Sequence, residues 1–459
     1  MFHISCKTST RSDSGKSSVS GIAVVARANP NEPFAISPDG SFLAHTPSGI
    51  IQGERVYESI FDVEDVKKAR LVAAIRLAEQ PNTGFQFNHI EFCDHGRYLL
   101  AIGPAATIYP GPDRSSTAQD LISAESEDFV KILDMKDNTL HADISLSTAE
   151  HSFPAEVLAR YKQINPEWHQ EKEGHGEVEF AACAANAPTA AVVINYGNEM
   201  STVKILDLEK GVEVQGFGGI PVQANVLGVA ISPQGSNLAL YRMRDVSDAA
   251  GEGSADHCLT IVDLQAKKIK ETILMKSDDA FDASIAYAGE STVAVELISY
   301  EYPSYDPSDS HLDPRFLGHH RASVHFFDAG SGSELHVISD PSADDFGLRG
   351  ISSDGRIMLA YSGKSRICKS CNRGTGEQEI TDARFTLWNP QTGQRIAESP
   401  ELKVVHHTCP WSLHDWLWDV HCVESDEAPI LKLSQDGSTV AASWASGGEP
   451  IEVYSFPMH

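Results

Sequence analysis

The chain has 459 residues, with 64 Asp and Glu against 36 Lys and Arg, for a formal net charge of −28. Such an acidic surface repels phosphate backbones, so we expect no general nucleic-acid binding. The first interpretation of the charge is that it keeps a large protein soluble, and the alternative is that it attracts a basic protein or peptide as partner. The sequence contains no run of about 18 apolar residues, the length that would predict membrane insertion. The N-terminus lacks an apolar leader, and eight cysteines in so long a chain do not indicate a disulfide scaffold, so we expect a cytoplasmic, reducing location.

Residues 1–19 are predicted to be a flexible tail, and the first predicted strand is GIAVVARA at 21–28. A unit of two hairpins then recurs along the chain. The first hairpin joins two apolar runs through a turn of the Ser-Pro-Asp-Gly type, whose Asp-Gly pair supplies the positive φ of a tight turn. It occurs at 35–45, 90–102, 229–241, 349–362 and 431–443, and in degenerate form at 178–196 and 284–297.

The second hairpin of each unit is an apolar strand, a turn and an alternating strand. It occurs at 59–75, 130–146, 203–217, 259–274, 324–339 and 385–399. Each turn is predicted to open on an Asp or Asn whose side chain accepts hydrogen bonds from the turn's backbone amides. These residues are Asp62, Asp134, Asp207, Asp263, Asp328 and Asn389.

Two hairpins give four strands per unit. The Ser-Pro-Asp-Gly hairpin and the hairpin around Trp388 resemble blades of the WD-repeat-type β-propellers, although the usual Trp-Asp dipeptide is missing from the strand ends. The resemblance implies an all-β fold, a seven-bladed propeller of four-stranded antiparallel blades, forming one domain over 20–459. The last unit lacks an outer strand, and we expect the strand at 21–28 to pair with 451–456 and close the ring.

The connections between predicted strands differ greatly in length. All the short turns fall on one face of the propeller, and the long insertions fall on the other. The insertions are 103–128, 147–176, 241–257, 298–322, 363–383 and 400–428. Because binding residues are often carried on loops held by a rigid scaffold, the decorated face is the candidate site. The alternative is that insertions accumulate wherever a fold tolerates them.

Four cysteines lie in two neighbouring insertions, Cys368 and Cys371 in a Cys-x-x-Cys pair and Cys409 and Cys422 in the next. Together they have the chemistry of a tetrahedral structural zinc site that would join the two loops. A disulfide among them, or free thiols, are the alternatives. The other cysteines, of which three lie in or beside apolar strands, are expected to be core residues. They are Cys6, Cys93, Cys183 and Cys258.

Aromatic residues are concentrated in two insertions, where they suit anchors for a partner or packing against a blade. They are Trp411, Trp416, Trp418, Tyr300, Tyr302 and Tyr305. The sequence therefore predicts a non-enzymatic protein–protein interaction scaffold, with no catalytic residue assigned.

The alternative function is a metal-dependent hydrolase or lactonase acting at the mouth of the central channel. Polar residues near the starts of the innermost strands resemble the metal-centred tunnel of propeller hydrolases. These residues are Asn88, His89, Glu177, Asn225 and Asp282.

Overall fold

The structure is a computed structural model of the chain. It describes residues 21–26, 33–45, 60–68, 70–77, 83–85, 87–108, 122–145, 177–195, 200–214, 220–223, 225–247, 253–266, 268–277, 284–301, 319–367, 378–402, 405–406, 426–427, 429–443 and 451–456. The tail at 1–19 and the centres of the long insertions lie outside these residues.

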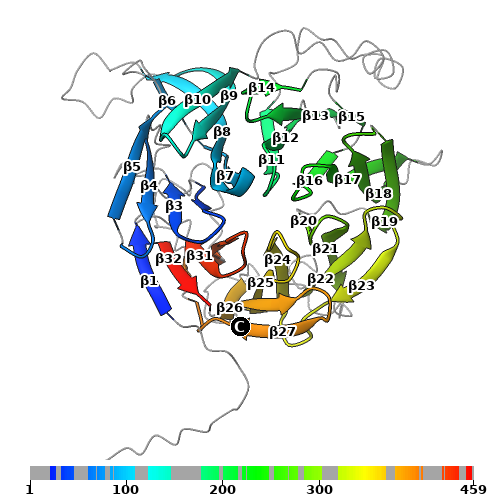
Figure 1. The fold of residues 1–459 in the computed structure, drawn as a ribbon. Coiled ribbons are helices and arrows are strands. Elements are labelled where there is room, and N and C mark those ends of the chain that lie inside the picture. The colour runs from blue at the N-terminus through cyan, green and yellow to red at the C-terminus, as the bar shows by residue number, and fades with distance from the viewer. Residues whose placement is uncertain are drawn as a thin grey trace, which may run out of the picture.

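Seven antiparallel sheets stand around a central axis like the blades of a propeller, as predicted (Figure 1). The inner strands of blades 1 to 7 are β2 (Ala35–Ile36), β7 (His89–Cys93), β11 (Glu177–Cys183), β16 (Asn225–Ile231), β20 (Ile285–Tyr287), β24 (Asp345–Ile351) and β30 (Ile430–Leu433). The second strands are β3 (Phe42–His45), β8 (Tyr98–Ile108), β12 (Thr189–Asn195), β17 (Asn237–Ser247), β21 (Thr292–Glu301), β25 (Met358–Ile367) and β31 (Thr439–Ser443).

The two outer positions of each blade follow the same order. The third strands are β4 (Ile60–Asp65), β9 (Ile122–Asp134), β13 (Met200–Asp207), β18 (Gly253–Asp263), β22 (His319–Asp328), β26 (Gln378–Asn389) and β32 (Ile451–Ser455). The outer strands are β5 (Arg70–Arg76), β10 (Thr139–Ser145), β14 (Val212–Glu213), β19 (Lys268–Ser277), β23 (Glu334–Ile338), β27 (Gln394–Glu398) and β1 (Gly21–Ala26). Additional short strands are β6 (Thr83–Phe85) on β8, β15 (Ile220–Gln223) on β13, and the pair β28 (Val405–His406) and β29 (Asp426–Glu427).

Blade 7 combines the two ends of the described chain. Strand β1 pairs antiparallel with β32, from Gly21 opposite Ser455 to Ala26 opposite Ile451. That this strand is what holds the ring closed stays a prediction. Independently of β1, Phe34 and Ile36 of blade 1 pack in one cluster with Ala441 and Val453 of blade 7.

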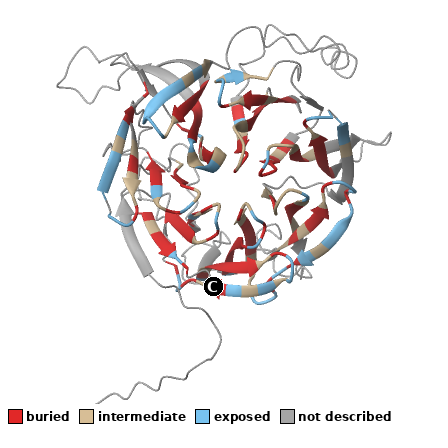
Figure 2. Cartoon of the chain, viewed as in Figure 1, coloured by how far each residue is buried: buried red, intermediate tan, exposed pale blue. Residues whose placement is uncertain are grey.

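The core is divided among the seams between blades. Seven clusters of buried apolar side chains are found in the described residues, and each one joins two neighbouring blades. The inner, second and third strands are largely buried, whereas the outer strands are exposed at the rim (Figure 2). Because burial of apolar area contributes about 25 cal/mol per Å², the packing of each blade on both neighbours, together with the strand ladders, holds the ring together.

The first-hairpin turns show why Ser and Asp recur there. In blade 1 the Ser37 hydroxyl accepts the Phe42 N–H at 2.9 Å and donates to Asp39 Oδ1 at 2.8 Å. Gly40 has φ +68°, in the left-handed region where only glycine is unstrained. The turns beginning at Ser352 and Ser434 repeat this arrangement.

The second-hairpin turns confirm five of the six predicted side-chain acceptors, namely Asp134, Asp207, Asp263, Asp328 and Asn389. The sixth prediction, Asp62, is wrong. Asp62 lies inside β4 opposite Ala74, and Asp65 accepts the Lys68 N–H at 2.9 Å in its place. The pKa values follow these positions, because burial raises the pKa of Asp62 and the hydrogen bonds from Lys68 lower that of Asp65.

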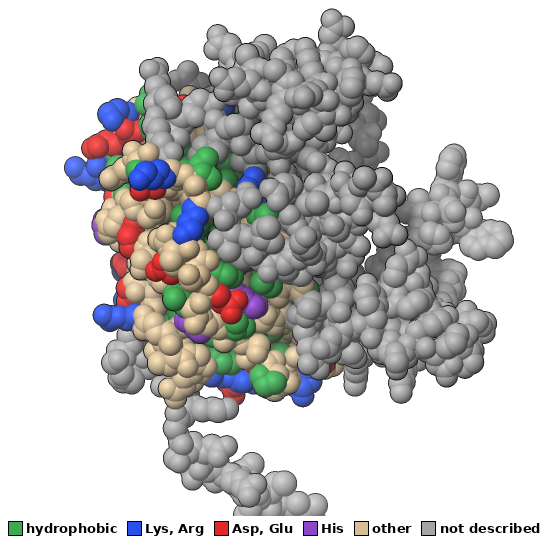
Figure 3. Space-filling model, turned by 90° about the vertical axis from the view of Figure 1, so that its right-hand side faces the viewer, with side chains coloured by type: hydrophobic (Ala, Val, Ile, Leu, Met, Phe, Trp, Pro, Cys, Tyr) green, Lys and Arg blue, Asp and Glu red, His purple; other side chains and the backbone are tan. Residues whose placement is uncertain are grey.

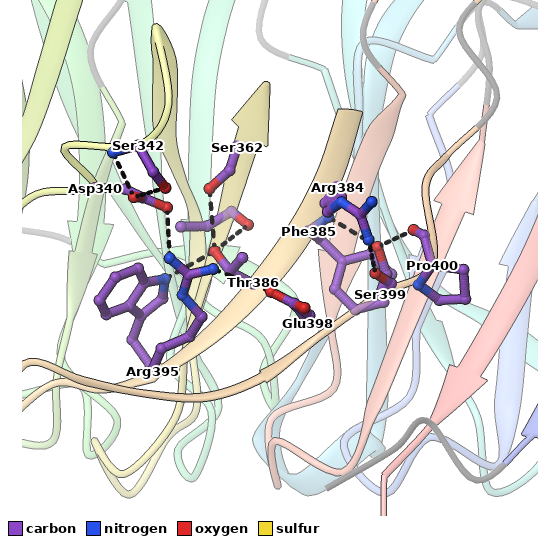
Figure 4. Close-up of polar contacts among 12 residues, drawn as sticks. Asp340, Ser342, Ser362, Arg384, Phe385, Thr386, Arg395, Glu398, Ser399 and Pro400 are labelled. Carbon is purple, nitrogen blue, oxygen red and sulfur yellow. Dashed lines mark hydrogen bonds and ion pairs between the residues drawn. The ribbon is translucent and has the colours of Figure 1, made fainter. Parts of the chain in front are cut away.

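Trp388 is buried at the seam between blades 5 and 6. Its Nε1 donates to Thr386 Oγ1 at 2.8 Å, and the Arg395 guanidinium lies over its ring at 5.3 Å from the centroid. Arg395 also pairs with Asp340 at 3.1 Å and with Glu398 at 3.0 Å (Figure 4). The residue that carries the WD-type resemblance thus connects two blades.

Candidate interaction face and central channel

One face of the propeller is made of hairpins that continue past the inner strands. In blade 4, β17 and β18 pair from Asn237–Asp263 to Ser247–Gly253, while the inner strand β16 stops at the level of Met243. The four residues beyond Met243 extend the hairpin by roughly 13 Å at about 3.3 Å per residue. We call this side of the molecule the long-connection face.

Three other blades have the same extension. In blade 5 the ladder reaches Glu301 opposite His319. In blade 6 it reaches Ile367 opposite Gln378, and in blade 2 it reaches Ile108 opposite Ile122. The insertions predicted at 103–128, 241–257, 298–322 and 363–383 therefore begin and end on paired strands, and their centres lie outside the described residues.

The opposite face is closed by the seven first-hairpin turns, which we call the turn belt. At five seams a backbone N–H of one turn donates to the turn of the next blade. These bonds are Asp436 to Pro38 O (2.9 Å), Asp94 to Ala184 O (3.1 Å), Asn186 to Pro233 O (2.8 Å), Gln234 to Glu290 Oε2 (3.0 Å) and Ser353 to Gln435 O (2.7 Å). All five run in the same direction around the ring.

At the other two seams the turns meet closely at a glycine. A Cβ on Gly355 would lie 2.7 Å from the carbonyl carbon of Ala288, and a Cβ on Gly96 would lie 2.9 Å from Pro38 Cδ. The belt side of the molecule is thus in close contact around its whole circumference.

Charges on the described part of the rim are mixed. Seen from the edge of the disc, Lys, Arg, Asp and Glu side chains alternate with hydrophobic ones (Figure 3). Opposite charges pair across the second-hairpin turns, as in Lys68 with Asp65 at 2.8 Å. Exposed pairs of this kind are screened by solvent, so they contribute little to the stability of the fold.

The axis of the ring contains a cavity of about 290 Å³ that is lined by all seven inner strands. Most of its lining is small or apolar. The charged lining residues are His89 and Glu91 on blade 2, Arg349 on blade 6 and Lys432 on blade 7. His89 Nε2 lies 3.1 Å from Glu91 Oε2, so each of these two side chains is a polar partner of the other.

Arg349 links the cavity to a buried carboxylate. Its Nη1 lies 3.9 Å from Glu296 Oε2, and that oxygen accepts the Leu348 N–H at 2.9 Å. Burial raises the pKa of Glu296 to about 7, against the opposing effect of Arg349. Glu296 therefore changes its charge near neutral pH at the seam between blades 5 and 6.

A disulfide joins two inner strands beside the cavity. Cys93 ends β7 and Cys183 ends β11, and their Cα atoms are 5.3 Å apart. Both side chains also belong to the apolar cluster between blades 2 and 3. The expectation that these cysteines are buried in the core is thus confirmed, but the disulfide between them was not predicted. Cys258 is buried on β18, as expected.

The residues predicted to bind zinc and most of those predicted to contact a partner lie outside the described residues. These are Cys368, Cys371, Cys409, Cys422, Trp411, Trp416, Trp418, Tyr302 and Tyr305. Tyr300 is described by its backbone, in β21 opposite His320. Within the described ranges no group of three or more His, Cys, Asp and Glu is arranged to hold a metal ion.

The alternative channel residues are only partly described. His89 lines the cavity, and Asn88 is exposed just before β7 with its N–H bonded to Ile102 O at 2.7 Å. Glu177 and Asn225 are placed by their backbone at the starts of β11 and β16. Asp282 lies outside the described residues, and the hydrolase interpretation stays a prediction.

Sequence reasoning missed Glu91, Arg349 and Lys432 in the channel. These residues lie near the ends of the inner strands, and our prediction considered only the starts. Aligning the units on their turns would have placed all three two or three residues before the turn, at the level of Ala182 and Ala230 in other blades.

In the part of the chain that the structure covers, no helix has the length and apolar character needed to cross a membrane.

No family model and no curated protein matches the sequence. Among solved structures, a chain of a mitotic checkpoint complex is 10% identical with a TM-score of 0.47, over 100% of this chain and 98% of that one. U3-55K is 11% identical with a TM-score of 0.47 (96% and 100%), and the RRP9 WD40 repeats are 10% identical with a TM-score of 0.46 (96% and 99%). The fold assignment rests on this chain's own seven four-stranded blades.

Proposed function

We propose that this protein is a non-enzymatic scaffold that binds a protein or peptide through its long-connection face. The observation that carries the proposal is the inequality of the two faces. Hairpins of four blades project from one face, whereas the turns of the other bond to one another. On the turn belt, backbone N–H and C=O groups are already used in contacts between blades.

The projecting hairpins are suited to binding because their stems are paired strands. In blade 4 every residue from Asn237 to Ser247 has a partner in β18. Paired stems of this kind are preorganised, and preorganisation lowers the entropy lost when a partner is bound. We propose Trp411, Trp416 and Trp418, with the tyrosines at 300, 302 and 305, as the anchoring side chains.

The net charge of −28 supports a basic partner. Electrostatic attraction of this kind acts mainly on the association rate and falls with ionic strength. We therefore expect association to slow between 50 and 500 mM salt while the dissociation rate changes less.

We further propose that Cys368, Cys371, Cys409 and Cys422 hold one structural zinc ion that joins two insertions. Support comes from the described ends of these insertions. Strand β26 follows the first insertion, strands β28 and β29 pair at the two ends of the second, and β29 lies against β26. Metal analysis of reduced, chelator-free protein should find one zinc per chain, lost in a Cys368→Ser/Cys371→Ser variant. Protein without zinc would overturn this proposal.

The scaffold proposal is tested by shortening the hairpins. Because Met243 and His257 are directly paired, replacing 244–256 with Asn-Gly leaves a two-residue hairpin turn in blade 4. In blade 5, 298–322 can be replaced in the same way, since Leu297 pairs with Ser323. The control changes two exposed residues on the turn-belt side, Lys136→Ser and Asp137→Ser.

Affinity capture from native extract compares these variants with the unmodified chain. We expect partners bound by the wild type and the control to be lost or weakened at least tenfold when a hairpin is shortened. Identical recovery by all variants, or loss of binding only in the control, would overturn the proposal.

A further inference from the structure

The disulfide occupies a particular place in the ring. Cys93 and Cys183 are 90 residues apart in sequence, yet they end the inner strands of adjacent blades 2 and 3. The bond therefore crosses a seam between two blades and reinforces no single sheet. Both side chains are buried, with exposed fractions of 0% and 7%.

The residues that follow the two cysteines continue the connection. The Asp94 N–H donates to Ala184 O at 3.1 Å, and the His95 N–H donates to Ala185 O at 2.6 Å. Three consecutive positions of blade 2 are thus bonded to three consecutive positions of blade 3, once by sulfur and twice by hydrogen bonds. We call this group the 93–95 seam.

The backbone of the 93–95 seam is strained. Asp94 and His95 have φ of 49° and 54°, in the left-handed region that disfavours residues with a Cβ. In the Ser-Pro-Asp-Gly type turns of blades 1, 4, 6 and 7, only the glycine has a positive φ. Contacts at the seam must therefore offset a conformational cost that those turns do not carry.

Hydrogen-bonding groups of Glu91 lie beside both cysteines. Cys93 Sγ lies 3.5 Å from Glu91 O, within the range of a thiol hydrogen bond, and Glu91 Oε2 accepts the Cys183 N–H at 3.1 Å. Cys183 is also one of the residues that line the axial cavity.

We propose that Cys93 and Cys183 form a reversible disulfide that controls the opening of the 93–95 seam. In the forward direction two protein thiols react with one low-molecular-weight disulfide such as oxidised glutathione. One S–S bond forms in the protein, the S–S bond of the reagent breaks, and the two protons leave on the two released small thiols. The propeller is then tighter at this seam in an oxidising environment than in a reducing one.

The first measurement establishes the bond in the full-length protein. Samples equilibrated with oxidised or reduced glutathione are alkylated, digested without reduction and analysed by mass spectrometry. We expect a linked pair of peptides containing Cys93 and Cys183 in the oxidised sample, and two alkylated peptides in the reduced one. Alkylated thiols at both positions in the oxidised sample would overturn the proposal.

The second measurement follows the consequence for the seam. Closing a loop of this length predicts a melting temperature about 5 °C higher in the oxidised wild type than in the reduced one. Amide hydrogen exchange at residues 94–96 and 184–186 should be at least tenfold faster in the reduced state. A Cys93→Ala/Cys183→Ala variant should show the reduced behaviour in both buffers, and Cys258→Ala should behave as the wild type.

Exchange and melting temperature that do not change with redox state, in protein shown to be linked and unlinked, would overturn the proposal. If the double variant does not fold, the comparison of oxidised and reduced wild type by hydrogen exchange still decides the question.

Discussion

The two faces of this propeller are built from the same strands and differ only in how those strands are connected. On the turn-belt side the connections are short, and they bond from blade to blade in one direction. On the long-connection side the second and third strands continue past the inner strand before they turn. From this difference we infer that contacts on one face stabilise the ring and connections on the other face bind a partner. Residues on the binding face can then change without loss of ring stability.

The largest test of this division is a substitution inside the belt. Gly355 has φ +71°, and an added Cβ would lie 2.7 Å from a backbone atom of blade 5. Gly393, at a rim turn, has φ +66° and would meet no atom closer than 3.7 Å. We expect Gly355→Ala to lower the free energy of unfolding by about 3 kcal/mol and Gly393→Ala by about 1 kcal/mol, measured by urea denaturation. If both substitutions lower the free energy of unfolding equally, the loss comes from the positive φ alone and the contact between blades makes no contribution.

The second test is the pH dependence of the seam between blades 5 and 6. The pKa of Glu296 is raised to about 7 from an ordinary value of 4.5. Because the folded protein then binds the proton more tightly than the unfolded chain, this group makes stability increase as pH falls from about 7 toward 4.5. Relative to Glu296→Gln, the wild type should gain about 2 kcal/mol between pH 8 and pH 5, in urea denaturation at each pH. A constant difference between the two proteins would contradict this.

Glu290 gives a smaller effect within the belt. Its carboxylate on blade 5 accepts the Gln234 N–H and the hydroxyls of Ser232 and Ser236 on blade 4. Glu290→Ala leaves these donors without their acceptor, and we expect a loss of about 1.5 kcal/mol in the free energy of unfolding. The control is Glu209→Ala, an exposed residue 3.7 Å from Arg97, for which the expected loss is below about 0.5 kcal/mol. If Glu290→Ala lowers the free energy of unfolding no more than Glu209→Ala does, the Glu290 side chain does not stabilise the belt.

The smallest expected effect on stability is on the other face. Replacing 244–256 with Asn-Gly removes the part of the blade 4 hairpin beyond the inner strand, together with the pairing of Ala255 and Asp256 with β19. We expect the free energy of unfolding to change by less than about 1 kcal/mol, because loop length has a weak effect on closure entropy. A loss as large as that of Gly355→Ala would show that the projecting hairpins support the ring and would contradict the division of roles.

The repeat and the blade count could be predicted because each depends on local residues. A Ser, an Asp and a Gly within four consecutive residues, as in Ser37, Asp39 and Gly40, predict a turn. The misplaced turn at Asp62 shows the limit of such reasoning. Asp62 and Asp65 are acidic residues three positions apart, the prediction named only Asp62, and the pairing of β4 with β5 shows that Asp65 opens the turn.

The channel and the disulfide could not be predicted in the same way. Cys93 and Cys183 become neighbours because β7 and β11 stand side by side in the ring, and the spacing of 90 residues carries no signal of this. The charged channel residues likewise come from different blades, and their meeting depends on the exact offset of each inner strand. The residues proposed in the insertions, such as Cys368 and Cys371, were chosen by residue type and spacing, and they lie outside the described residues.

The closed ring gives every blade two neighbours. Opening a single seam therefore leaves seven blades connected in an open arc, and no blade is released. A lock placed at one seam, such as the bond between Cys93 and Cys183, would act on the diameter of the axial cavity and on the spacing of the hairpins above it. Oxidation or reduction of two sulfur atoms at one seam would in this way alter the spacing of blades around the whole ring.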